Sequence, residues 1–98
     1  MVLSESICEI EIEIRNADGL HMRPAMQFVD VASKYQCDIK VSNGDTKVDA
    51  KSIMQMTMLA AICGTKLTVR AEGVDCRQAI DELQELVEEK LFGEPPKK

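Results

Sequence analysis

The sequence predicts an α+β fold: an open-faced β-sandwich with the element order βαββαβα, in which three helices cover one face of a four-stranded antiparallel-type sheet. Two kinds of pattern predict it. Apolar residues alternate with polar ones in several short segments, which is typical of half-buried strands. Between these segments they recur at spacings of three and four, which is typical of amphipathic helices.

The first strand is expected over residues 7–15, where cysteine and isoleucine residues alternate with three glutamates. The glutamates indicate a solvated sheet face rather than a surface for a metal or a cationic partner. The first helix is expected over residues 22–35. Its apolar stripe consists of Ala25, Phe28, Val29 and Ala32.

A hairpin follows, with strands at residues 37–41 and 46–49 joined by the turn sequence Ser-Asn-Gly-Asp. The second helix is expected from Ser52 to about Ala61, because Ser52 and Gln55 have the spacing of a capping box.

Within the second helix, Met58 and Leu59 are assigned to the core, whereas Ile53 and Met54 are expected to be exposed. The last strand is expected over residues 66–72 and the third helix over residues 76–91.

Length and composition predict one domain over residues 1–98, with a core over about 7–91 and a frayed tail at 92–98. The net charge of −5 argues against a nucleic-acid partner, because nucleic-acid binding requires basic patches. No apolar run is long enough to span a bilayer, and the first residues lack the pattern of a signal peptide. We therefore expect a cytoplasmic protein without a membrane partner.

The four cysteines are expected to be reduced thiols, at least three of them in the core. They are widely scattered, without a C-x-x-C pair or a neighbouring histidine, so neither a metal site nor another cofactor is expected. Three of them share the spacing of apolar neighbours and behave as small apolar residues. The four are Cys8, Cys37, Cys63 and Cys76.

The stretch Gly-Leu-His-Met-Arg-Pro-Ala at residues 19–25 holds the only histidine, His21. It lies where a strand pattern stops and a helix pattern starts, and Pro24 suits the first turn of a helix. The N-terminus of a helix has unpaired N–H groups and partial positive charge, and therefore binds phosphate well. A neutral imidazole there can accept a phosphoryl group, and Arg23 offers donors to its oxygens.

This stretch predicts a phosphohistidine, although a histidine that only caps a helix would have the same spacing. One helix layer on one sheet leaves no deep cleft for a small molecule. A reactive side chain on the surface indicates a phosphoryl-transfer protein with a phosphohistidine intermediate rather than a stand-alone enzyme.

In its element order and in three stretches, the chain resembles HPr, the histidine-containing phosphocarrier of the bacterial phosphoenolpyruvate-dependent sugar phosphotransferase system. The stretches are residues 19–25, Ala-Ser-Lys-Tyr at 32–35 and Lys-Ser-Ile-Met at 51–54, and the resemblance covers about residues 10–91. It implies that Nδ1 of His21 takes a phosphoryl group from enzyme I and passes it to enzyme IIA domains. It also implies that Arg23 contacts the phosphoryl group.

The resemblance further implies that Ser52 is the serine that HPr kinase/phosphorylase modifies in many relatives, although a helix cap also explains a serine there.

Ile53 and Met54 match an apolar patch for partner docking. Met22 stands where the family usually has alanine, adds apolar bulk beside His21 and is expected to take part in partner docking. Asp30 stands where relatives often have lysine, which bears on docking to the acidic surface of enzyme I. The protein is expected to act as a monomer.

Two alternatives remain open. Within the same class, the chain could be an NPr-like regulatory carrier of a nitrogen-related or incomplete phosphotransferase system. From another class, a βαββαβ core also builds metal-trafficking and small-molecule-sensing modules. The metal chaperones among these carry paired cysteines at the first loop, where this chain has His21 and Arg23.

Overall fold

The computed structural model describes residues 7–93, and its elements follow the predicted βαββαβα order. The boundaries of β3 and β4 are those expected, and those of β1, α1 and β2 shift slightly. After α3 the chain continues as a π-helical turn and a 3₁₀ turn. The elements are β1 (Ile7–Glu13), α1 (Met22–Ser33), β2 (Asp38–Asn43), β3 (Thr46–Asp49), α2 (Ile53–Thr57), β4 (Lys66–Glu72), α3 (Cys76–Gln84), η1 (Glu85–Glu89) and η2 (Leu91–Gly93).

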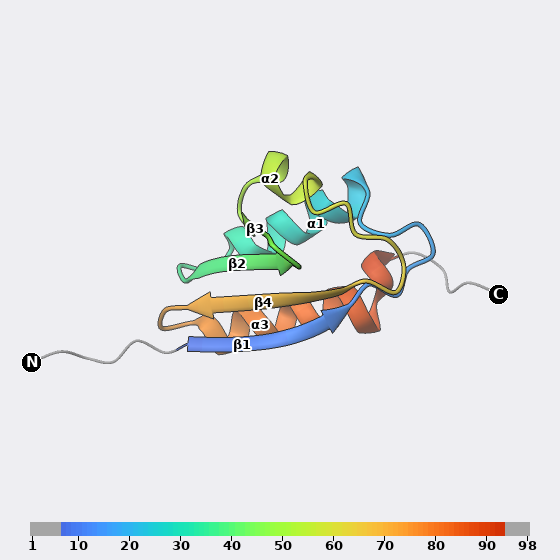
Figure 1. Cartoon of the computed structure of the whole chain (residues 1–98). Helices are drawn as coiled ribbons and strands as arrows, with labels where there is room; N and C mark the ends of the chain where they lie inside the picture. Colours follow the sequence, from blue (N-terminus) through green and yellow to red (C-terminus); the bar gives the residue numbers. More distant parts are fainter. Residues whose placement is uncertain (1–6, 94–98) are drawn as a thin grey trace, which may run out of the picture.

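The four strands form one antiparallel sheet in the order β1-β4-β2-β3. The register aligns one apolar residue from each strand in a row across the sheet: Ile10, Val69, Val41 and Val48. Figure 1 shows α1 and α3 running along the sheet, α1 beside β2 and β3 and α3 beside β4 and β1. The open-faced α+β sandwich predicted from the sequence is therefore confirmed.

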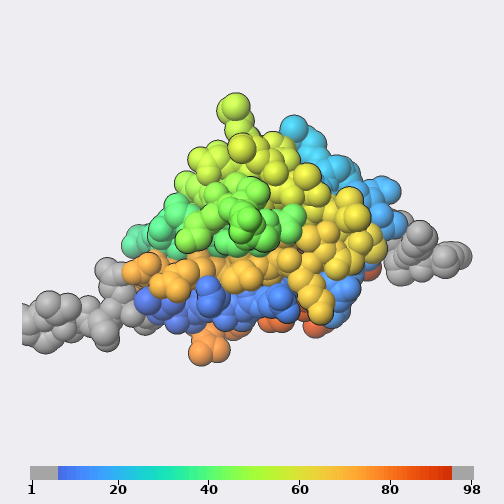
Figure 2. Space-filling view, viewed as in Figure 1, coloured from blue at the N-terminus to red at the C-terminus, as the bar shows by residue number. Residues whose placement is uncertain are grey.

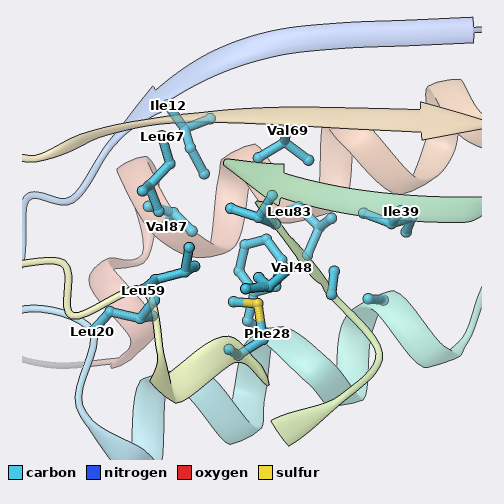
Figure 3. Packing of buried hydrophobic residues seen from close by; sticks show 14 of the residues in the cluster. Ile12, Leu20, Phe28, Ile39, Val48, Leu59, Leu67, Val69, Leu83 and Val87 are labelled. Carbon is cyan, nitrogen blue, oxygen red and sulfur yellow. The ribbon is translucent and has the colours of Figure 1, made fainter. Parts of the chain in front are cut away.

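The core lies between this apolar sheet face and the helices. Phe28 of α1 and Leu83 of α3 point into it from the helices, and Leu67 and Val69 from β4 (Figure 3). The opposite face of β1 carries the glutamates, and Glu9 pairs there with Arg70 of β4 at 4.0 Å. The strand alternation thus separates an apolar layer from a solvated one, as expected.

The second helix is shorter than predicted, and one core assignment in it was wrong. It ends at Thr57 rather than near Ala61, and Ala60 has a left-handed backbone with φ of 50°, which no helix can continue. Met58 is 66% exposed, whereas Met56 is fully buried and Leu59 is buried as expected. Because helix neighbours on one face are three or four residues apart, Met56 and Met58 cannot both face the core.

The C-terminal boundary of the core was also misplaced. The third helix is α-helical only to Gln84, and Phe92, assigned to a frayed tail, is fully buried in the 3₁₀ turn. A left-handed backbone at Phe92, with φ of 56°, turns the chain so that this ring reaches the core. The rest of the predicted tail, from residue 94 onward, lies outside the described residues.

Candidate functional site

His21 is the N-cap residue of α1. Its backbone is extended, with φ of −86° and ψ of −168°, and its carbonyl accepts the first helical hydrogen bond from the N–H of Ala25 at 2.9 Å. The imidazole makes no capping hydrogen bond to the helix, and the residue is exposed. The backbone of His21 therefore starts the helix, and its imidazole does not cap it.

The loop before His21 is fixed by hydrogen bonds on both sides. The side-chain amide of buried Asn16 donates to the Gly19 carbonyl at 2.7 Å, and the N–H of Leu20 donates to the Ala61 carbonyl at 2.8 Å. Gly19 has φ of 75°, and a Cβ there would lie 2.7 Å from the Ala61 oxygen. Only glycine leaves room for this close approach of the two backbone segments, so the loop holds His21 in one position.

Arg23 follows in the first turn of α1 and is exposed like His21. Pro24 and Ala25, the next two residues, are buried and anchor the turn to the core. The first turn contains no acidic residue. No carboxylate within that turn therefore offsets the partial positive charge at this helix end, and the arrangement favours an anion such as phosphate.

An open groove of about 440 Å³ lies between α1 and α2 and begins at Met22, directly after His21. Figure 2 shows the start of α1, in light blue, beside α2, in yellow-green, at the top of the molecule. We call this surface the methionine groove. Its lining residues are Met22, Met26, Val29 and Asp30 from α1 and Ile53, Met54 and Thr57 from α2.

The groove unites the residues expected to dock partners, with one correction. Met22 and Met54 are 56% and 79% exposed, and an exposed apolar surface of this kind marks an interaction site. Ile53, expected to be exposed, is only partly so, because it packs against the core from the start of α2. Met26, 50% exposed, was missed. Its spacing of four from Met22 was the available signal for a second apolar stripe on α1.

Ser52 caps α2 as expected, but the capping box is only half formed. Its hydroxyl accepts the N–H of Gln55 at 3.3 Å. The Gln55 side chain does not return to the N–H of Ser52 and instead accepts the N–H of Asp49 at 2.8 Å, tying α2 to the end of β3. Ser52 is partly exposed and directly precedes Ile53, which lines the groove.

Within residues 7–93, no group of three or more histidine, cysteine, aspartate and glutamate side chains is placed to hold a metal ion. Over the same residues, no helix combines the length and the apolar character required to cross a membrane.

Together these features define a class of protein. An exposed histidine stands at a helix N-terminus beside an open apolar groove, an arrangement typical of small domains whose site is accessible to other macromolecules.

Comparisons with known proteins identify the family. A family model described as the PTS HPr component phosphorylation site matches residues 8–89. The phosphocarrier protein HPr of Pseudomonas aeruginosa is 46% identical over 79 residues, which cover 80% of this chain and 88% of that protein. The chain belongs to the HPr family of phosphocarrier proteins of the phosphotransferase system.

Solved structures agree with this assignment. HPr-C-His from Thermoanaerobacter tengcongensis matches with a TM-score of 0.85 and 44% identity, over 90% of this chain and 98% of that one. Crh of Bacillus subtilis, described as a dimer with a swapping domain, matches with a TM-score of 0.68 and 38% identity, over 81% and 91% of the two chains. These matches favour the carrier over the metal-trafficking or sensing alternative.

Proposed function

We propose that this protein takes a phosphoryl group from enzyme I on Nδ1 of His21 and passes it to enzyme IIA domains of a sugar phosphotransferase system. One observation carries the proposal: the only histidine of the chain is exposed at the N-cap of α1, and its ring does not cap the helix. Membership of the HPr family supports a role in the phosphotransferase system.

In the transfer, the lone pair of Nδ1 attacks the phosphorus atom of the donor's phosphoryl group. A P–N bond forms as the donor's bond to phosphorus breaks, so the phosphoryl group moves without release of free phosphate. The N-terminus of α1 stabilises the negative oxygens, and the guanidinium of Arg23 adds charge-assisted hydrogen bonds. The return step, to an enzyme IIA domain, reverses the same chemistry.

The methionine groove is the docking surface in this proposal. Partners bury Met22 and Met54 beside His21, and Ile53 lines the same groove while it packs against the core. Asp30 lies in the same groove and places a negative charge where family members often carry lysine. Against an acidic partner surface this charge weakens docking, so the natural enzyme I for this chain should be less acidic at that point.

The test is phosphorylation by enzyme I with phosphoenolpyruvate, followed by measurement of acid-labile phosphate. The parent protein should gain it and a His21→Ala variant should not, while Ser52→Ala should gain it as the parent does. Circular dichroism should show the same fold in all three proteins. Acid-labile phosphate on His21→Ala would refute the proposed site.

Ser52 is, in this proposal, also a regulatory phosphorylation site for an HPr kinase/phosphorylase. A phosphate there would meet the N-terminus of α2 and leave the fold intact, yet place negative charge beside Ile53 and Met54. Ser52→Asp, with about half that charge, should keep the melting temperature and slow phosphorylation by enzyme I. An unchanged rate would leave Ser52 with its capping role only.

We further propose that the carrier acts as a monomer in the cytoplasm, where other members of the phosphotransferase system meet it. Because Crh is described as a dimer, the proposed monomeric state of this protein should be measured. Light scattering at working concentration should give the mass of one chain, and a stable dimer would contradict this.

A further inference from the structure

Two cysteines far apart in the sequence meet at the end of the molecule where β1 and α3 begin. Sγ of Cys8 in β1 lies 3.1 Å from Sγ of Cys76, the first residue of α3, although 68 positions separate them. Both are free thiols. Figure 1 shows the two elements beginning side by side at the left end of the view.

The fold itself brings these thiols together. Cys8 has the same strand parity as Ile10 and Ile12 and therefore faces the helix layer, and its neighbour across the sheet is the small Ala71 of β4. Cys76 is 1% exposed beneath it. The pKa of Cys76 is raised, first by its hydrogen bond with Cys8 and then by burial, which keeps the Cys76 thiol protonated.

We propose that Cys8 and Cys76 form a reversible dithiol–disulfide site that is oxidised by low-molecular-weight disulfides of the glutathione type. An S–S bond is about 2.05 Å long, so a closure of about 1 Å between the two sulfur atoms makes it. The site is independent of His21 and of phosphoryl transfer.

Access favours Cys8 as the residue that reacts first. A surface hollow of about 360 Å³ between β1 and α3 is lined by Cys8, Arg77 and Ile80, among others, and Cys8 is only partly buried. Cys76 is buried beneath Cys8, so an oxidant in solution cannot reach its sulfur directly. The pair therefore has an outer attacking thiol and an inner resolving thiol, the arrangement that directs oxidation to a disulfide.

The reaction takes two exchange steps. The thiolate of Cys8 attacks one sulfur of the small disulfide, forms a mixed disulfide and releases one thiolate of the oxidant. Cys76 then loses its proton and attacks the Cys8 sulfur, which forms the Cys8–Cys76 bond and releases the second thiol. Two protein thiols are oxidised and one disulfide is reduced to two thiols.

The bond would tie an edge strand to the helix layer. Among the described strands β1 pairs only with β4, and the disulfide would close a long chain segment between β1 and α3. Closing a long segment restricts the unfolded chain and stabilises the folded one. α1 begins at the opposite end of the molecule from this pair (Figure 1), so oxidation should leave the surface around His21 unchanged.

The experiment uses the full chain with Cys63→Ser, which removes the exposed thiol that would otherwise link two molecules. The protein is incubated with oxidised glutathione, alkylated, digested and analysed by mass spectrometry. We expect a cross-linked peptide containing Cys8 and Cys76, and a rise in melting temperature of about 10 °C or more that dithiothreitol reverses. Phosphorylation of His21 should proceed equally before and after oxidation.

Two variants in the same background complete the test. Cys8→Ala should lose both the cross-link and the temperature shift, whereas Cys37→Ala, which removes a buried thiol outside the pair, should keep both. Full recovery of alkylated Cys8 and Cys76, a glutathione adduct that persists on Cys8, or a cross-link from Cys76 to Cys37 would each overturn the proposal.

Discussion

The backbone of His21 caps α1 and its side chain does not, and its position in the sequence could not show this difference. Its backbone provides the first carbonyl of α1, and its imidazole makes no capping hydrogen bond. Sequence spacing predicted the helix start but left open whether the ring serves the cap or the surface. The backbone does not decide this, because Ser52 is also extended and does cap its helix with its side chain, so only the side-chain positions show the difference.

Arg23→Lys should slow phosphoryl transfer from enzyme I without changing the fold. Lysine keeps the charge but loses the planar fork that can hold two phosphoryl oxygens at once. The loss of one such charge-assisted contact is worth about 1.5–3 kcal/mol, or a rate roughly ten- to a hundredfold slower. The rate is measured by quenched-flow labelling with enzyme I. Arg70→Lys, on the solvated sheet face, is the control, and an unchanged rate for Arg23→Lys would show that the helix end suffices.

Tyr35 should ionise only at strongly alkaline pH. Its hydroxyl donates to Glu82 of α3, and this hydrogen bond, followed by burial, raises its pKa from 10.0 to about 12. Because the folded pKa is the higher one, this contribution to stability is complete below pH 10 and is lost as pH rises toward 12. Tyr35 is the only tyrosine, so its phenolate absorbance reports this single group directly.

In an absorbance titration, the folded protein should show a midpoint near pH 12 and the urea-unfolded protein one near pH 10. Glu82→Gln should lower the folded midpoint toward 10, whereas Glu85→Gln, on the same helical segment, should leave it in place. Circular dichroism at each pH confirms that the chain remains folded. A folded midpoint near 10 would show that Glu82 does not accept this hydrogen bond in solution.

Among the elements, α2 shows most clearly what sequence periodicity can and cannot settle. Its start was predicted correctly, because the cap spacing of Ser52 and Gln55 is local chemistry. Its end was not, because the turn that stops it has Ala60, not glycine, in a left-handed conformation. With a helix this short, three methionines and one isoleucine gave no clear period, and Met58 was assigned to the wrong face.

Met54→Glu should weaken partner binding and leave stability nearly unchanged. Met54 is 79% exposed and lines the groove, so the substitution removes apolar contact area and places a charge on the proposed docking surface. The loss of the methionine contact alone is worth about 1.5 kcal/mol or more, which is at least roughly tenfold in affinity. Binding to enzyme I is measured by titration calorimetry, and stability by thermal melting.

Met58→Glu is the matched control, since Met58 is 66% exposed on the same turn but does not line the groove. It should bind as the parent does. Equal weakening by both variants would mean that net charge, rather than the groove, controls docking. A large fall in melting temperature for Met54→Glu would indicate that Met54 is part of the core rather than an exposed docking residue.

At the scale of the whole molecule, the order of strands and helices along the chain was predictable. Each strand shows a regular alternation of apolar and polar residues, and each turn contains residues that favour turns. The apolar row across the sheet follows from burying one face of every strand, whereas the spatial order β1-β4-β2-β3 was not predicted from the sequence. The ends of the fold were harder to predict. Phe92 follows the last helical stripe and precedes Gly-Glu-Pro-Pro, and only the closed core shows that one more large side chain is required.

Phe92→Ala should therefore destabilise the protein strongly, although the sequence places Phe92 next to a polar C-terminal stretch. The ring is fully buried, and replacing a buried phenylalanine by alanine costs about 3–5 kcal/mol. For a domain of this size that corresponds to a fall in melting temperature of roughly 12–40 °C. Alanine retains the Cβ, so it does not relieve the left-handed backbone at this position.

Leu91→Ala, at a partly exposed neighbour that also has a positive φ, is the control and should cost clearly less. Thermal melting of the three proteins measures the difference, and a Phe92→Ala variant that melts within about 3 °C of the parent would mean that the core is complete without this ring.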